Sequence, residues 1–223
     1  MASQRQPEPI RVLPRGRHAA PRDVVTRSQR ERLLAAISAA VAERGYARTA
    51  VADVLARAGV SRKSFYEQFA NKEECFLAAY DLGVDRVLQA IDDAIATAAD
   101  PAAAPAAGVH GYLGSLVEHP DFARTFLIEA LGAGPAALER RAVVHERFAE
   151  QFRRIYDGQR AALPELPELP PLRFRACVGA VDELVVEHVR LHGTEGLERL
   201  AEPLIDVVIG LLVGHETFAR LRG

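Results

Sequence analysis

Apolar residues recur at helical spacing along most of the chain. Between residues 28 and 44 they fall three and four positions apart, which places them on one face of an α-helix. No stretch alternates between apolar and polar residues for long enough to predict a strand. The pattern therefore predicts an all-α protein of about nine helices. Beyond the first helix, the predicted segments are 50–58, 62–68, 71–97, 106–118, 121–131, 136–161, 172–192 and 197–219.

Capping residues mark the ends of the first four helices. Gly45 ends the first helix, and the turn at Gly59 separates the second from the third. Ser61 can cap the helix over 62–68. Asn71, with Glu74 three residues later, forms a capping box at the start of 71–97. A helix, a short helix, a tight turn and a third short helix predict a helix-turn-helix.

Charge is distributed unevenly along the chain. The composition, 49% apolar and 26% charged, is that of a soluble globular protein, and the net charge is only −2. Residues 1–70, however, carry 13 Lys and Arg against 6 Asp and Glu, whereas residues 71–223 carry 15 against 24. A basic end on an acidic body favours a nucleic-acid partner for that end. The alternative is a basic tail without a partner.

Both lysines of the chain, Lys63 and Lys72, lie in the first turn of a predicted helix, as does Arg62. A cation there opposes the helix dipole, at a cost of roughly 0.3–1 kcal/mol. A polyanion that meets the helix ends would explain these charges better than folding does. The alternative is ordinary solvated charge. We therefore expect Lys72 to be a poor helix residue without DNA, so that its removal leaves the free protein equally or slightly more stable.

Several other classes of protein are disfavoured. Cys75 and Cys177 lie far apart without a CxxC spacing, which argues against a disulfide scaffold or a cysteine-based zinc site. His188 and His192 are four residues apart, but the Glu-x-x-His pairs of helical di-iron enzymes are missing. We expect no cofactor, no metal site and no enzymatic activity. No signal peptide or membrane span is recognisable, so a cytoplasmic protein without a membrane partner is expected.

Two features of the second half of the chain suggest sites. Polar residues share helical faces with aromatic ones: Glu129 with Phe126, and His145 with Phe148. These residues would line a pocket for a largely apolar effector with one polar or basic group, because a buried carboxylate needs a partner. Satisfied core polar groups are the alternative. The expected ligand-binding residues are Tyr112, Phe122, Phe126, Glu129, His145, Phe148 and Phe152.

The last two predicted helices have broad apolar faces, over 172–192 and 197–212. These faces carry more apolar surface than one contact per helix requires. Either a homodimer interface or a deep core would explain them. The residues expected in the interface are Val181, Val185, Leu204, Val208 and Leu211.

The stretch from Gly45 to Glu74, GYARTAVADVLARAGVSRKSFYEQFANKEE, resembles the DNA-binding domain of the TetR family. The AGVS, FY and NKEE elements are in register with the family pattern, and the resemblance covers about 50 residues. Ala50 and Ser64 depart from the pattern, where Thr or Ser and Gly are common.

The resemblance implies a homodimer whose third helix enters the major groove of double-stranded operator DNA. It implies phosphate contacts for Tyr66 and Lys72, a ligand pocket in the remaining helices, and a dimer interface on the last two. Arg62, Lys63 and Ser64 would then read base edges. The expected DNA-binding residues are Arg48, Thr49, Ser61, Arg62, Lys63, Ser64, Tyr66 and Lys72.

The chain is thus interpreted as three parts: a flexible basic arm over 1–26, a helix-turn-helix domain over 27–71, and a ligand-binding and dimerisation domain over 72–223. The expected function is that of a ligand-responsive transcriptional repressor, released from its operator by a small effector. An activator or a ligand-independent regulator of the same fold is the first alternative. A helical metal-binding protein or enzyme is the second.

Overall fold

The computed structural model describes residues 22–214, and in this range all regular secondary structure is helical, as predicted. Short 3-10 helices, η1 (Pro101–Ala103), η3 (Glu129–Gly132) and η4 (Leu197–Leu200), and one π-helical turn, η2 (Arg124–Ile128), lie between or extend the α-helices. The nine α-helices are α1 (Arg22–Arg44), α2 (Val51–Ala58), α3 (Arg62–Tyr66), α4 (Lys72–Ala96), α5 (Ala104–Glu118), α6 (Pro120–Ala123), α7 (Pro135–Ala162), α8 (Pro171–His192) and α9 (Ala201–Leu212).

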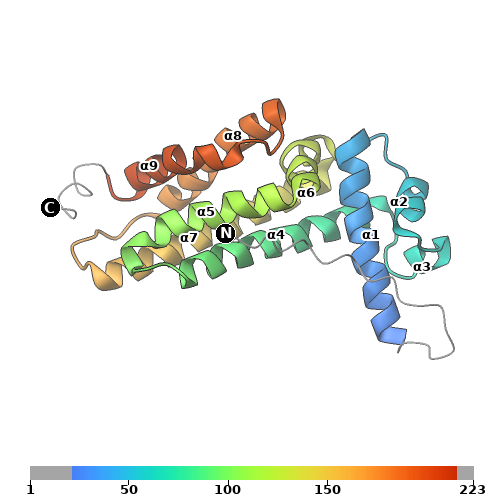
Figure 1. The fold of residues 1–223 in the computed structure, drawn as a ribbon, viewed down its shortest axis with the longest axis horizontal. Helices are drawn as coiled ribbons and strands as arrows, with labels where there is room; N and C mark the ends of the chain where they lie inside the picture. The colour runs from blue at the N-terminus through green and yellow to red at the C-terminus, as the bar shows by residue number, and fades with distance from the viewer. Residues whose placement is uncertain (1–21, 215–223) are drawn as a thin grey trace, which may run out of the picture.

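Helices α1, α2 and α3 lie together at one end of the molecule (Figure 1). The apolar face of α1 packs against α2 and the third-helix region, and its Leu33 and Ile37 are fully buried. Phe65 and Phe69 from the third-helix region are buried in the same core. Because these rings point inward, the opposite side of α3 is left to solvent.

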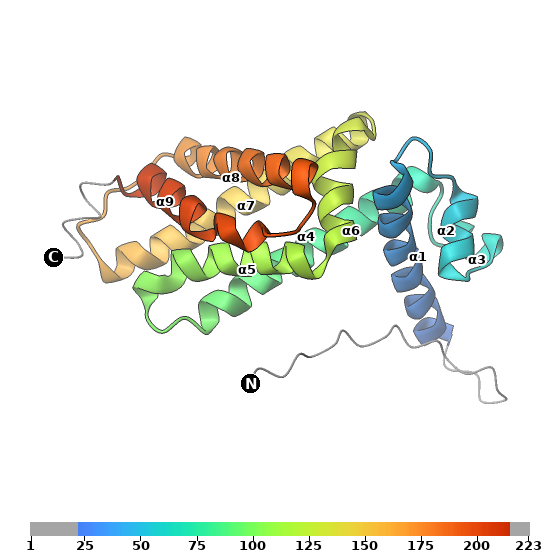
Figure 2. The same ribbon diagram turned by 45° about the horizontal axis from the view of Figure 1, so that its top comes forward.

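Helix α4 connects this end to the rest of the molecule. It runs beside α5 and α7 along the body, and α8 and α9 lie on the other side of these helices (Figures 1 and 2). Polar pairs join α4 to α7, among them Arg147 with Asp85 at 2.6 Å and Gln151 with Asp92 at 2.7 Å. A second apolar core fills the space between α4, α5, α7, α8 and α9.

Some boundaries differ from the expected ones. The first helix starts at Arg22, so residues 22–26, expected in the flexible arm, are helical. Pro21 directly before the helix and Asp23 in its first turn are residues that favour a helix start. The rest of the arm, 1–21, lies outside the described residues. The last helix, predicted over 197–219, begins as η4 and ends at Leu212, and residues 215–219 lie outside the described range. The segment predicted as one helix over 121–131 changes type twice, from α6 to the π-helical η2 and then to η3.

The expected dimer-interface residues are mostly core residues. Val181, Val185, Leu204 and Val208 are buried within the chain itself, and only Leu211 is partly exposed. Helices α8 and α9 pack against each other, α8 also packs against α7, and α9 also packs against α5. A deep core, the alternative to an interface, therefore explains the four buried residues.

Candidate nucleic-acid interface and ligand cavity

The turn between α2 and α3 has the geometry of a helix-turn-helix. Gly59 ends α2 in the left-handed conformation, with φ of 61°. Ser61 then caps α3, as predicted, because its hydroxyl accepts a hydrogen bond from the Ser64 N–H at 3.0 Å. Before α2, the Asp53 carboxylate accepts from the Ala50 N–H at 2.8 Å, although Ala50 has no side-chain oxygen to reciprocate. These local bonds set the direction of α3.

The exposed side of α3 carries most of the expected DNA-binding side chains. Arg62 and Lys63 are exposed, and the Lys63 side chain is 87% accessible. Tyr66 is also exposed, beside the buried Phe65. Arg48 lies on the surface as well, and its Nε donates to the Arg44 carbonyl at 2.6 Å. Cations and a phenol on one side of a short helix match the chemistry needed for phosphate and base contacts.

Thr49 does not belong to this surface. It is only 2% exposed, and its hydroxyl lies 3.2 Å from the Ala40 carbonyl and 2.9 Å from the Gly45 carbonyl, to which it can donate. The expectation that Thr49 contacts DNA is therefore wrong for its hydroxyl, which closes the turn between α1 and α2. The sequence could not distinguish the two roles, because Ser and Thr serve in both.

Lys72 has internal partners that the sequence did not reveal. Its Nζ donates to the carbonyls of Tyr46 at 2.8 Å and Thr49 at 2.9 Å, and lies 4.0 Å from the centre of the Tyr46 ring. Partial burial lowers the pKa of the ammonium from its usual value. Lys72 thus fastens the start of α4 to the turn before α2. The expectation that this lysine is merely a poor helix residue is wrong.

The start of α4 is capped as the sequence predicts. Asn71 Oδ1 accepts from the Glu74 N–H at 2.8 Å, while the Glu74 carboxylate accepts from the Ala70 N–H at 2.6 Å. The second bond reaches one residue further back than in an ideal capping box. The caps and Lys72 together hold α4 at a defined position relative to α3.

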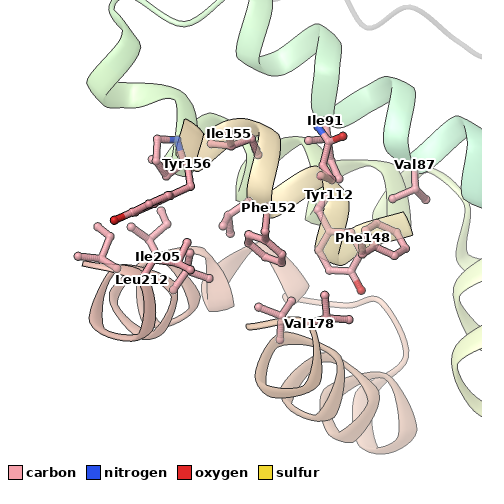
Figure 3. Close-up of a pocket in the computed structure, with 18 of the residues that line it drawn as sticks. Val87, Ile91, Tyr112, Phe148, Phe152, Ile155, Tyr156, Val178, Ile205 and Leu212 are labelled. Carbon is pink, nitrogen blue, oxygen red and sulfur yellow. The ribbon is translucent and has the colours of Figure 1, made fainter. Parts of the chain in front are cut away.

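A cavity of about 670 Å³ lies between α4, α5, α7, α8 and α9. Figure 3 shows Phe148 and Phe152 of α7, Val178 of α8 and Ile205 of α9 around this space. Its size falls within the usual range for small-molecule sites. Six of the seven expected ligand-binding residues line it: Tyr112, Phe122, Phe126, His145, Phe148 and Phe152.

Glu129, the seventh, does not line the cavity. Its carboxylate accepts a hydrogen bond from the backbone N–H of Tyr46 at 3.2 Å and would lie 3.0 Å from a Cβ added to Gly45. Glu129 therefore holds the end of α1, and its expected role in the pocket is wrong. The spacing of a regular α-helix predicted that Glu129 shares a face with Phe122 and Phe126. The segment instead changes from a π-helix to a 3-10 helix at Glu129, so its side chain faces away from the cavity.

One polar cluster borders the cavity, and the sequence revealed only part of it. Arg141 pairs with Asp182, and its Nη1 lies 2.8 Å from His145 Nε2. Tyr80 and Tyr112 also line the cavity. Burial raises the pKa of the Tyr80 phenol to about 12 and shifts that of Tyr112 in the same direction. Sequence spacing could not join these residues, because they come from four different helices.

Aromatic rings connect the cavity with the helix-turn-helix. Phe126, which lines the cavity, stacks on Tyr80 at 4.7 Å between ring centres and contacts Phe76 at 5.1 Å. Phe76 in turn packs edge-on against Tyr46 at 4.8 Å, and Tyr46 contacts Lys72. A continuous path of packed side chains thus runs from the cavity wall to the turn before α2.

The segment α6–η2–η3 adds direct bonds to α1. Arg124 Nε donates to the Ala42 carbonyl at 2.9 Å, and the Thr125 hydroxyl donates to the Ser38 carbonyl at 2.8 Å. Together with Glu129, these residues attach a cavity-wall segment to the last two turns of α1. Irregular helical turns of this kind are frequent at functional sites.

Within residues 22–214, no helix is long and apolar enough to cross a membrane. No group of three or more His, Cys, Asp or Glu side chains there is arranged to hold a metal ion. The rings of His188 and His192 lie 5.1 Å apart, and His188 Nε2 is 2.9 Å from the Glu195 carbonyl. This pair therefore packs at the end of α8.

The comparisons with known proteins agree with this arrangement. Residues 33–79 match the model of the bacterial regulatory proteins of the tetR family. No curated protein matches the chain significantly.

Many solved structures share the fold. The fatty acid degradation regulator FadR of Bacillus halodurans aligns with a TM-score of 0.73 and 19% identity, over 82% of this chain and 95% of its own. FadR of Bacillus subtilis, solved with stearoyl-CoA, aligns with a TM-score of 0.71 and 17% identity, over 82% and 98%. A TetR regulator of Chloroflexus aurantiacus J-10-FL shows 25% identity and a TM-score of 0.66, over 83% and 96%.

The family match covers α2, α3 and the parts of α1 and α4 that pack against them. The structural matches extend over the remaining helices. The motif, the family match over residues 33–79 and the shared fold together show that the chain carries a DNA-binding domain of the tetR family and has the fold of solved TetR-family regulators.

Proposed function

We propose that the protein is a transcriptional repressor that binds double-stranded operator DNA as a homodimer and is released by a small, largely apolar effector. The observation that carries the proposal is the connection between the cavity and the helix-turn-helix. A ligand that moves Phe126 acts on a residue packed against Phe76 and Tyr46. It also acts on the segment bonded to α1 through Arg124 and Thr125.

Release by population shift follows from this connection. An effector that binds better to the conformation with poorly spaced recognition helices lowers operator affinity by its differential affinity for the two states. In a homodimer, operator affinity depends on the distance between the two copies of α3, because they must contact two half-sites about one turn of the DNA helix apart. The B. subtilis FadR–stearoyl-CoA complex shows that a protein of this fold can hold a ligand with a long apolar chain.

Helix α8 offers a surface for the second copy. Leu184 and Leu191 are 40% and 55% exposed and lie seven residues apart, so they share one face of the helix. Pairing of this face across a two-fold axis would bury them. We therefore propose the outer side of α8 as the dimer interface, in place of the core residues of α8 and α9.

In this proposal the DNA contacts come from Arg48, Arg62, Lys63, Ser64, Tyr66 and Lys72, with Ser61 as the cap that orients α3. The division into a DNA-binding domain up to residue 71 and a ligand-binding domain after it follows the same plan. The protein has no catalytic role in this scheme, and it works in the cytoplasm, where the operator is.

Selection from random DNA duplexes with the purified full-length protein tests the proposal. A palindromic consensus is expected, followed by reduced transcription in vitro from a promoter that overlaps the selected site. Increased transcription would favour an activator of the same fold. A failure to select any sequence would contradict operator binding.

A further inference from the structure

The wall of the cavity is apolar except at a few places, and these places differ in exposure. Asp100, Glu202 and Asp206 line it but are exposed, so they lie at its solvent edge. Gln151 and Tyr156 are enclosed, but Gln151 donates to Asp92 and Tyr156 to the Pro167 carbonyl. A cluster of enclosed polar groups elsewhere on the wall belongs to Tyr80, Tyr112, His145 and Asp182. A ligand that fills the cavity must satisfy the enclosed groups, because water cannot do so once it is displaced.

The charges in the enclosed cluster cancel. Arg141 is bonded to Asp182, and both side chains are largely buried. His145 Nε2 lies 2.8 Å from the Arg141 guanidinium, which can only donate hydrogen bonds, and 3.7 Å from the Asp182 carboxylate. The cluster therefore offers no unpaired positive charge. Among the residues that line the described cavity there is also no Lys or Arg.

The phenols of Tyr80 and Tyr112 are the unsatisfied members of the cluster. Neither hydroxyl has a hydrogen-bond partner among the described residues. Tyr80 is almost completely buried and stacks on Phe126, while Tyr112 packs edge-on against Phe148. Both phenols line the cavity, so a ligand that displaces water from it leaves these hydroxyls unpaired unless the ligand supplies an acceptor, and an acceptor would be bound there selectively.

We propose that the effector is an uncharged, elongated apolar molecule with a carbonyl-type acceptor oxygen, held by the hydroxyls of Tyr80 and Tyr112. The inference rests on the proposed effector site and narrows its ligand class. A carboxylate would enter past Asp100, Glu202 and Asp206 and would face Asp182 without an available cation. The phosphates of an acyl-CoA would meet the same acidic edge. An ester, ketone or lactone presents the acceptor without the charge.

Four compounds that share a ten-carbon chain test the inference: methyl decanoate, decanoate, decanoyl-CoA and decylamine. Binding to the full-length protein would be measured by calorimetry and by the shift in melting temperature. We expect methyl decanoate to bind at least tenfold more tightly than the other three. Equal or tighter binding of any charged compound, or no binding of any of the four, would overturn the proposal.

Three tyrosine variants locate the acceptor site. Tyr80→Phe and Tyr112→Phe should each weaken binding of methyl decanoate about tenfold, the loss expected for one hydrogen bond. Tyr156→Phe is the matched control, because this phenol also lines the cavity but already donates to the Pro167 carbonyl at 2.8 Å. Its affinity for the ester should be unchanged. Equal effects of all three variants, or none, would refute the role of Tyr80 and Tyr112.

DNA binding of the unliganded protein separates this inference from the proposed function. Specific DNA binding combined with a preference for a charged compound would refute only the ligand class. Ester binding that depends on both tyrosines, without DNA binding, would refute only the proposed repressor function.

Discussion

Lys72 shows how one residue can have both a structural and a DNA-binding role. Its ammonium donates to two backbone carbonyls and covers the Tyr46 ring, which holds α4 against the turn before α2. Part of the side chain remains accessible, near the start of α4. A phosphate could therefore use the remaining hydrogen of the ammonium while the carbonyls keep the other two.

Lys72→Ala should lower the free energy of unfolding by about 1–3 kcal/mol, because two charge-assisted hydrogen bonds are lost from a partly buried site. If Lys72 also contacts phosphate in both subunits, the slope of log K against log salt should fall by about 1.8. A melting curve and a salt titration of operator binding measure the two effects. An unchanged melting temperature would disprove the structural role, and an unchanged slope would disprove the phosphate contact.

Lys63 represents the opposite case, since its side chain has only a 4.0 Å ion pair with Glu67 and is otherwise solvated. Lys63→Ala should therefore change the free energy of unfolding by less than about 0.5 kcal/mol. In contrast, it should alter base preference at one symmetric pair of operator positions by roughly 1–3 kcal/mol. Binding to a panel of operator variants measures this effect. Arg57→Ala, which removes an exposed ion pair with Glu43, is the control and should leave base preference intact.

At the scale of elements, the segment α6–η2–η3 joins the cavity to α1. Three of its side chains line the cavity: Phe122, Phe126 and Leu127. Two others, Arg124 and Thr125, donate hydrogen bonds to carbonyls of α1, and Glu129 accepts one from the Tyr46 N–H, just after α1. The π-helical turn allows one short segment to contact both the cavity and α1, because it changes which side chains face the cavity. Gly83 contributes as well, since an added Cβ would lie 1.7 Å from the Phe122 ring.

Glu129→Ala should speed hydrogen exchange at the Tyr46 amide, because the variant lacks the Glu129 carboxylate that accepts the hydrogen bond of this N–H. Glu129→Gln keeps a carbonyl acceptor and should exchange nearly as slowly as the original protein. Because Glu129 does not line the cavity, methyl decanoate should bind equally to both variants. Fast exchange in the glutamine variant, or a loss of ligand affinity in either, would contradict this assignment.

At the scale of the whole molecule, the outer face of α8 is the surface proposed for dimerisation. Leu184→Glu combined with Leu191→Glu should give a folded monomer with greatly reduced operator affinity, because a monomer meets only one half-site. Light scattering and circular dichroism together measure assembly and folding. Val24→Glu, at an exposed apolar position of α1, should remain dimeric. A dimeric double variant would show that the subunits meet elsewhere.

Leu204→Glu tests the distinction between core and interface. Leu204 is fully buried within the chain, so a carboxylate there should unfold the protein. Loss of the thermal unfolding transition is expected, in contrast to the cooperative melting of the α8 variant. If Leu204→Glu instead gives a folded monomer, Leu204 of α9 is part of the dimer interface.

The helices and the helix-turn-helix could be predicted from the sequence alone. These features depend on local interactions: the spacing of apolar residues, the caps at Ser61 and Asn71, and the turn at Gly59. The sequence also identified six cavity residues, because aromatic side chains at helical spacing share one face of their helix.

What each helix face contacts is known only from the tertiary structure. Helical spacing groups Leu204 with Val208 but cannot tell whether their neighbour is the same chain or a second copy. It cannot show that Lys72 reaches the Tyr46 carbonyl, or that Arg141, Asp182 and Tyr112 border one cavity. These contacts join residues far apart in sequence, and their geometry depends on how whole helices pack.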